Sequence, residues 1–170
     1  PDGTVISFVA EGVRITPNCA SSAGQCTVTL STQNPRPLDN RVTVLAYVEG
    51  DKSFVDKNGD NVYTVDTDTL SSNIGDFFRD DNEDNLYSAN LGEYLYKRGA
   101  SGATCAPSEI RQPNIVGTCD NKLDAVIRQQ LLFAFAENTP TFTNVNASGS
   151  LLSFNMYGNS AQSVPMPTGT

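Results

Sequence analysis

The sequence predicts an all-β fold, an antiparallel β-sandwich with a long, irregular acidic insertion. Three observations support this fold class. Short runs rich in β-branched and aromatic residues recur along the 170 residues, Gly, Pro and Asn turns separate them, and helix signals are scarce. A chain of this length can bury one core. We expect the first part of the sandwich at 1–50, the insertion at 51–121, and the closing strands, or the start of a next module, at 122–170.

The N-terminal part contains the clearest strand patterns. Residues 4–10 form a β-rich run, and residues 27–30 alternate polar with apolar side chains, as a half-buried strand does. Residues 34–37 carry two prolines and must form a loop, because prolines so close cannot sit in a paired strand. Residues 41–48 predict a strong strand. Apolar side chains on both of its faces indicate cover on both sides, at least in part.

The C-terminal part is less regular. Residues 94–121 are rich in Gly, Pro and Cys and predict a loop. The apolar run that begins at Leu123 is compatible with a helix or a long strand. We choose a strand, because the Thr-rich sequence that follows favours β structure. Residues 151–157 and 163–166 predict further strands.

The four cysteines form two close pairs, Cys19 with Cys26 and Cys105 with Cys119. No CxxC motif and no histidine is present to complete a zinc site. The simplest interpretation is two local disulfides, the first of which would staple a hairpin turn. Four unpaired buried thiols are the alternative. Disulfides indicate an oxidising, extracellular or cell-surface location.

Composition excludes several functions. Without histidine, Ser-His-Asp and Cys-His catalysis are impossible. The net charge of −8 and the pI near 4.3 disfavour nucleic acid and anionic membrane surfaces as partners, since both repel an acidic protein. No apolar run approaches the roughly 20 residues that span a bilayer. The chain begins with Pro1 and no signal peptide, so we expect a processed or excised piece of a longer protein. Metal ions are the natural partners of so acidic a chain.

The acidity is local. Residues 49–93 contain twelve acidic and three basic side chains, a net charge of −9, which leaves +1 for the rest of the chain. Within this stretch a pattern occurs twice, 24 residues apart, at 54–63 and 78–87. Both copies follow F-x-D-x-N-x-D-N-φ-Y, where φ is apolar. The acidity is therefore a local feature with its own internal order.

This spacing is typical of a calcium loop. Oxygen ligands at loop positions 1, 3 and 5, followed by a carbonyl at position 7, converge on one hard cation when the chain curls around it. Position 6 needs a sharp turn, for which Asn is the next best residue after Gly. Position 12, where an EF-hand has Glu, is Thr67 or Leu91 here, so a neighbouring acid must close the loop. The candidate Ca²⁺ ligands are Asp56, Asn58, Asp60, the Val62 carbonyl and Asp66 or Asp68, then Asp80, Asn82, Asp84, the Leu86 carbonyl and Glu93.

Two alternatives to calcium apply to this stretch. Asp and Asn favour turns on their own account, so the repeats could be simple solvated turns. The acidic pairs Asp80 and Asp81, or Asp84 and Glu93, could also serve as carboxylates for acid–base catalysis. Their place inside a repeat with ligand spacing favours cation binding, and we expect no enzymatic activity.

Several segments together resemble a known family. The strings at 2–8, 15–19, 24–28, 33–37 and 41–47, followed by the acidic repeats, are similar to bacterial immunoglobulin-like domains of the group 1, invasin/intimin type. The resemblance covers roughly residues 2–96. It implies Ig-like sandwich modules strung in tandem in large secreted or surface proteins of Gram-negative bacteria, and it implies no catalysis. In the family, two further strands precede the first of these strings.

These observations lead to one principal function and two alternatives. The principal one is an extracellular structural or adhesive module that Ca²⁺ rigidifies, with neighbouring modules, and a host or cell-surface ligand, as partners. If the first strands are missing, open sheet edges could instead pair identical subunits into a filament or pilus-like fibre by strand donation. A carbohydrate-binding module is weaker, because the chain has no Trp for a sugar platform.

Overall fold

The computed structural model describes residues 1–102 and 104–166. These residues form an all-β protein in which every strand pairing is antiparallel. The strands are β1 (Val5–Ala10), β2 (Val13–Ile15), β3 (Asn18–Ala20), β4 (Leu30–Thr32), β5 (Arg41–Asp51), β6 (Phe54–Val55), β7 (Thr69–Leu70), β8 (Phe77–Phe78), β9 (Leu95–Tyr96), β10 (Asp124–Ala134), β11 (Thr141–Ser148) and β12 (Leu151–Tyr157). A single 3₁₀ turn, η1 (Ala89–Leu91), precedes β9.

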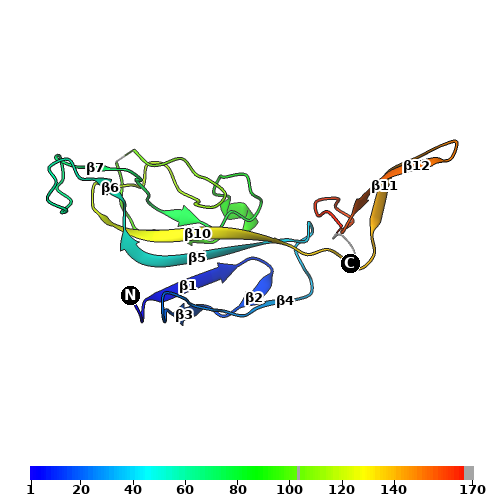
Figure 1. The fold of residues 1–170 in the computed structure, drawn as a ribbon, viewed down its shortest axis with the longest axis horizontal. Coiled ribbons are helices and arrows are strands. Elements are labelled where there is room, and N and C mark those ends of the chain that lie inside the picture. Colours follow the sequence, from blue (N-terminus) through cyan, green and yellow to red (C-terminus); the bar gives the residue numbers. More distant parts are fainter. Residues whose placement is uncertain (103, 167–170) are drawn as a thin grey trace.

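The central element is a four-stranded sheet with the order β10-β5-β1-β3. β5 and β10 pair along their full length, from Asp51 opposite Asp124 to Arg41 opposite Ala134. Residues 51–121, which make up nearly all of the chain between these two neighbouring strands, are called the acidic segment below. It leaves the sheet at one end of β5 and returns at the start of β10 (Figure 1). The remaining strands form two-stranded sheets.

The core lies between this sheet and the acidic segment. Register places Leu45 and Val126 on the same face of the sheet, where they form a buried cluster with Phe77 of the acidic segment. Tyr47 extends the cluster, since its ring centroid lies 5.5 Å from that of Phe77 and 5.5 Å from that of Tyr96. The segment expected to be an insertion therefore supplies one of the layers that bury the core.

The opposite face of the sheet, which we call the open face, is covered unevenly. Val42 and Val44 are buried there, at the end of β5 where β1 leads into β2. Further along β5, on the same face, Ala46 and Val48 are only partly buried. The expectation that residues 41–48 are covered on both sides in part is thus confirmed.

Two sequence predictions of strands were wrong. Residues 27–29 are not part of a strand, and β4 begins at Leu30. The ladder with β2 stops there because Pro17 has no N–H and its carbonyl accepts the Phe8 N–H (2.8 Å). Residues 163–166 form only an isolated bridge between Tyr157 and Pro165, since proline cannot continue a ladder.

Other predictions are confirmed. The run after Leu123 is a strand, β10, and residues 34–37 form a loop. Both disulfides are present, Cys19 with Cys26 and Cys105 with Cys119. The first one closes a tight turn in which Ser22 and Gln25 exchange backbone hydrogen bonds of 2.8 and 3.0 Å. Among residues 1–102 and 104–166, no helix has the length and apolar character needed to cross a membrane.

Candidate metal sites

Each acidic repeat folds into a loop organised around its first aspartate. In loop 1 (56–68), Asp56 accepts the N–H of Asn61 at 2.7 Å and that of Gly59 at 2.7 Å. In loop 2 (80–93), Asp80 accepts the N–H of Asn85 at 2.8 Å and that of Asp84 at 3.2 Å. The carboxylate of position 1 thus accepts the N–H of position 6 in both loops, and its second bond comes from position 4 in loop 1 and from position 5 in loop 2.

Positions 3 and 5 also match between the two loops. In loop 1, the Asn58 amide donates to Asp60 Oδ2 at 2.9 Å, and Asp60 Oδ1 accepts the Val62 N–H at 2.8 Å. In loop 2, Asn82 donates to Asp84 Oδ2 at 2.9 Å, and Asp84 Oδ1 accepts the Leu86 N–H at 2.7 Å. The 24-residue repeat in the sequence is therefore a repeat of hydrogen bonds as well.

A second carboxylate closes each loop. In loop 1, Asp68 accepts the N–H groups of Lys57 (2.9 Å) and Thr64 (2.7 Å), which are positions 2 and 9. In loop 2, Glu93 accepts the N–H groups at the same two positions, Asp81 (3.2 Å) and Ser88 (2.6 Å). Both side chains belong to buried residues. Asp68 and Glu93 thus occupy equivalent places, although they follow position 1 at different distances along the chain and Glu93 is longer by one methylene group.

The left-handed turn predicted at position 6 is present in both loops. Asn61 has φ 59° and Asn85 has φ 63°. Position 4 is also left-handed, with φ 77° at Gly59 and φ 55° at Glu83, which the sequence analysis did not predict. Glycine adopts this conformation at little cost, whereas a residue with a Cβ, such as Glu83, is strained in it. The carboxylate of Glu83 forms an ion pair with Arg41 at 3.0 Å.

Of the two acids proposed to close loop 1, Asp68 lies at the closing position. Asp66 is exposed, with its backbone at φ 70°. The side chains of Val62 and Leu86 are also exposed, at 61% and 67%, as expected if these residues contribute only their backbone.

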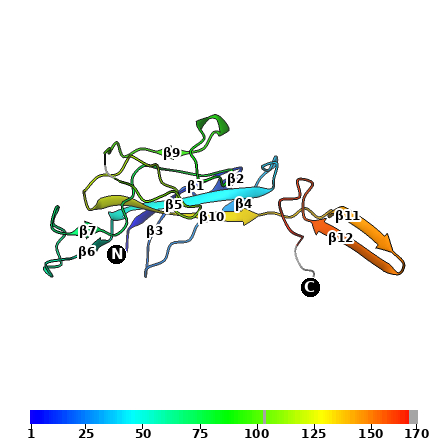
Figure 2. The same cartoon turned by 90° about the horizontal axis from the view of Figure 1, so that it is seen from above.

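The two loops contact different parts of the protein. Loop 2 lies on the sheet, where the Thr43 hydroxyl donates to the Asp80 carbonyl (3.2 Å) and the Asp80 N–H donates to Gln130 (3.0 Å). Loop 1 lies at the end of the molecule opposite β11 and β12 (Figures 1 and 2). It is fixed by the Tyr63 hydroxyl, which donates to the Asn121 carbonyl at 2.9 Å.

The aromatic residues that frame each repeat pack as pairs. The rings of Phe54 and Tyr63 lie 5.4 Å apart, and those of Phe78 and Tyr87 lie 5.9 Å apart. Phe78 is buried, so in loop 2 the pair joins the repeat to the interior. These rings anchor the loops.

The equivalent aspartates differ in their electrostatics. Hydrogen bonds from the backbone, first that of Asn61, lower the pKa of Asp56. Burial raises the pKa of Asp80, although that carboxylate accepts a matching set of N–H groups. Burial likewise raises the pKa of Glu93. Loop 2 therefore holds two carboxylates whose negative charge is costly without a positive partner.

The donors fit a hard cation in chemical kind. Both loops provide carboxylate, amide and carbonyl oxygens in the order that calcium loops use. Each carboxylate oxygen has more than one lone pair, so an N–H bond leaves capacity for a further contact. In the part of the chain that the structure describes, no three His, Cys, Asp or Glu side chains converge closely enough to hold an ion. The carboxylates are turned to the backbone instead.

Two basic residues that the sequence analysis did not single out fix the acidic segment. Arg128 of β10 is buried beneath it and donates to Pro113 O (3.0 Å) and to Asn114 Oδ1 (2.8 Å). Its guanidinium also lies 5.1 Å from the Phe77 ring centroid. Lys52 pairs with Asp120 at 2.8 Å. The sequence signal for the role of Arg128 is its place in β10: it lies two residues after Val126, on the face of the strand that is buried.

Comparisons with known proteins identify no relative: no family model, no curated protein and no solved structure matches this chain.

Proposed function

We propose that this chain is an extracellular structural module of a bacterial surface protein, and that Ca²⁺ bound by the two acidic loops rigidifies it. The observation that carries the proposal is the agreement between the loops. Two segments with different sequences at positions 2, 4 and 9 share most of their hydrogen bonds. These include the bonds to a closing carboxylate, which lies at a different distance along the chain in each loop. A simple solvated turn is stabilised by hydrogen bonds between Asp or Asn and the adjacent backbone, and does not require a second carboxylate from a distant position.

The residues that would hold the ion are those of the repeats. In loop 1 they are Asp56, Asn58, Asp60, the Val62 carbonyl and Asp68. In loop 2 they are Asp80, Asn82, Asp84, the Leu86 carbonyl and Glu93. A bound cation supplies the positive charge that buried Asp80 and Glu93 lack, and it links the two ends of each loop.

The wider assignment rests on the fold class and the disulfides. An all-β chain with two disulfides is compatible with an extracellular protein. The Ig-like sandwich of the invasin/intimin type is part of the same proposal, with the acidic segment as the layer that covers one face of the sheet. Repeating modules of this kind act as stalks or adhesive elements.

Other roles have less support. The tyrosines Tyr47, Tyr94 and Tyr96 pack against the core cluster, which removes them from an exposed sugar platform. Asp81 is held by Arg79 at 2.5 and 2.7 Å, and Glu93 accepts two backbone N–H groups. These carboxylates are engaged in holding the loop, which favours a structural role over acid–base catalysis.

The test is thermal unfolding of the chain in EDTA and then in excess Ca²⁺. Ca²⁺ should raise the midpoint, because an ion that binds only the folded state stabilises it. Asp68→Asn and Glu93→Gln should each remove part of this gain, since they neutralise the closing carboxylates while keeping their size. Asp66→Asn is the matched control and should leave the gain unchanged.

Two results would contradict the proposal. One is a midpoint that does not respond to Ca²⁺. The other is an Asp66→Asn variant that loses as much of the gain as Asp68→Asn, because the effect would then reflect net charge and not a site. Isothermal titration with Ca²⁺ gives the number of sites, for which we expect two in the original chain and one in each closing variant.

A further inference from the structure

β11 and β12 form a hairpin with one apolar and one polar face. Phe142 lies opposite Met156 and Ala147 opposite Leu152, with a register shift between Thr143 and Asn146. Counting back by alternation from Ala147 places Val145 on the same side. We call the apolar side the hairpin face; it comprises Phe142, Val145, Ala147, Leu152, Phe154 and Met156. The other side carries Ser153 and Asn155 in the middle of β12, with Leu151 and Tyr157 at the two ends of that strand. This alternation is that of a sheet with one covered face.

Within this chain the hairpin face is uncovered. Phe142 is 50% exposed, Leu152 60% and Phe154 45%. The rings of Phe142 and Phe154 contact each other, at 5.1 Å between centroids. A two-stranded hairpin is at best marginally stable in water, and a contiguous apolar patch on a protein surface marks an interaction site. The face therefore requires a partner layer.

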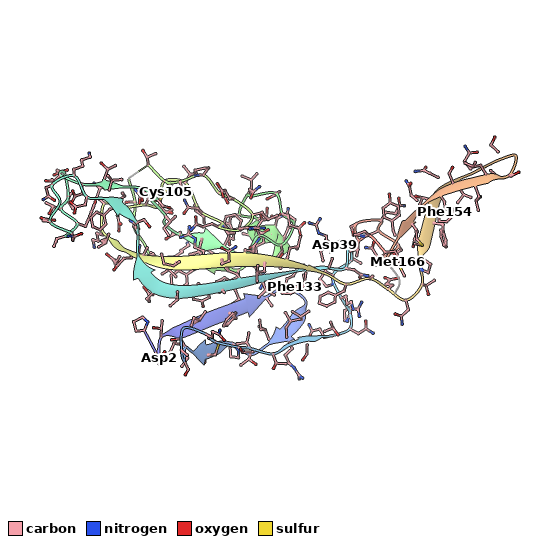
Figure 3. All side chains as sticks on the ribbon, in the orientation of Figure 1. Asp2, Asp39, Cys105, Phe133, Phe154 and Met166 are labelled. Carbon is pink, nitrogen blue, oxygen red and sulfur yellow. A yellow bond between two sulfur atoms is a disulfide. The ribbon has the colours of Figure 1, made fainter. Side chains whose placement is uncertain are left out.

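The hairpin is fixed at its base and extends away from the rest of the protein. Asn159, which follows β12, donates to the Asp39 carbonyl at 2.8 Å, and the Ser163 hydroxyl donates to the same carbonyl at 2.6 Å. Figures 1 and 2 show the hairpin projecting beyond the end of β10, and Figure 3 shows Phe154 far from the sheet. Held in this position, it cannot cover its own sheet, so the partner layer comes from another molecule.

The chain itself carries a matching surface. On the open face, Ile6, Ala46, Val48 and Ile127 line a groove of about 200 Å³. Leu131 and Phe133, on the same face by register, are 52% and 40% exposed. Arg128 also borders the groove, but its guanidinium lies on the other face, where it binds Pro113 and Asn114.

The two surfaces also match in charge. Residues 138–166 contain no Asp, Glu, Lys or Arg, although the chain as a whole carries a charge of −8. The groove is lined by uncharged side chains apart from Arg128. Two copies of so acidic a protein repel each other over most orientations. A contact between the hairpin face and the groove keeps charge out of the interface.

We propose that the hairpin face of one copy packs on the open-face groove of a second copy. The hairpin then completes a β-sandwich across two chains, with the two inner faces about 10 Å apart. The contact joins two different surfaces, so it leaves one hairpin and one groove free and can add further copies head to tail. It joins faces, and so differs from strand donation at sheet edges. It does not depend on calcium binding.

The test is sedimentation velocity over a broad range of protein concentration. The original chain should show a mass that rises with concentration beyond that of a dimer. Phe154→Asp should weaken association at least tenfold, because it places a charge in the centre of the hairpin face. Ser153→Asp, on the polar side of the same strand, is the matched control and should associate like the original chain.

Two variants, Ile127→Glu and Gln129→Glu, test the groove. Gln129 is exposed and the change to Glu keeps its size, so we expect this variant to fold normally. Both should weaken association. Mixing Phe154→Asp with Gln129→Glu should give a dimer and nothing larger. The first variant keeps an intact groove and the second an intact hairpin face, so the mixture can form one contact and no second one. Circular dichroism verifies that every variant is folded.

Three results would overturn the proposal. The first is an original chain that stays monomeric at every concentration. The second is normal assembly of both groove variants while Phe154→Asp fails, which would mean that the hairpin face covers a different surface. The third is equal loss in Ser153→Asp, which would show that any charge on the hairpin acts non-specifically. Since all measurements are made in EDTA and repeated in Ca²⁺, failure of the calcium proposal is seen separately.

Discussion

Lys52 and Asp120 join the two ends of the acidic segment. The Lys52 amine lies 2.8 Å from Asp120 Oδ1 and donates to the Asp120 carbonyl at 2.9 Å, and its side chain is fully buried. The Lys52 N–H also donates to the Leu123 carbonyl at 2.7 Å. The segment is thus closed at its base by an ion pair, a hydrogen bond from the Lys52 amine to the Asp120 carbonyl and a backbone hydrogen bond, next to the point where β5 meets β10.

Lys52→Met should lower the free energy of unfolding by about 2 kcal/mol, because it removes the ion pair with Asp120 and the donor to the Asp120 carbonyl, and leaves Asp120 Oδ1 with the Lys122 N–H. Urea unfolding measures this loss. Lys57→Met, which removes the same charge at an exposed residue of loop 1, is the control and should change stability far less. Equal effects in the two variants would show that only net charge matters.

Arg128→Met should destabilise the protein by about 3 kcal/mol, since it leaves the buried Pro113 and Val126 carbonyls without this donor and removes one of the two donors to Asn114 Oδ1, the other being the Gly75 N–H. Burial also lowers the pKa of Arg128 to about 10, yet the group stays charged at neutral pH. Arg14→Met at an exposed position of β2 is the control. If Arg128→Met unfolds at the urea concentration of the original chain, Arg128 does not hold the acidic segment on the sheet.

Asn61→Ala and Asn85→Ala should each cost about 1 kcal/mol, because a left-handed backbone strains any residue with a Cβ and Asn tolerates it best. Asn61→Gly and Asn85→Gly should be neutral or stabilising. For Asn85 the gain should be larger, since its buried Oδ1 lacks a hydrogen-bond partner. Thermal unfolding in EDTA compares the four variants. Equal midpoints for the Ala and Gly variants would contradict the role of the turn.

Stability without metal should fall as the pH rises from about 4.5 to about 7. Burial, and after it the charge of Asp81, raises the pKa of Glu11 from 4.5 to about 7. Between these values the folded state binds more protons than the unfolded state, so a higher pH favours unfolding. Midpoints in EDTA across this window measure the slope. Glu11→Gln should flatten it, and an unchanged slope would assign the effect to other groups.

Much of the sheet could be predicted from the sequence, because its strands obey local rules. The alternation at 41–48 and the β-branched run at 4–10 indicate strands regardless of their partners. The error at 27–29 has a non-local cause: Pro17, which lies between β2 and β3, ends the ladder that these residues would need. β11 was not predicted, since its pattern is interrupted by the bulge after Thr143.

In the candidate sites, too, local features could be predicted from the sequence and features that depend on distant residues could not. The first half of each loop, with its left-handed Asn at position 6, follows from spacing alone. The choice of Asp68 over Asp66 does not, because it depends on which carboxylate reaches the N–H groups of Lys57 and Thr64. The role of the acidic segment in the core was also hidden, since Phe77 is buried by strands that lie far from it in the sequence.

The full-length pairing of β5 with β10 determines how the protein bears a mechanical load. β10 leads directly to the hairpin base, so a pull on the hairpin acts along the strand (Figure 1). In this shear geometry all the ladder bonds from Asp51–Asp124 to Arg41–Ala134 are loaded together and cannot open one after another. A module built in this way resists stretching along its long axis.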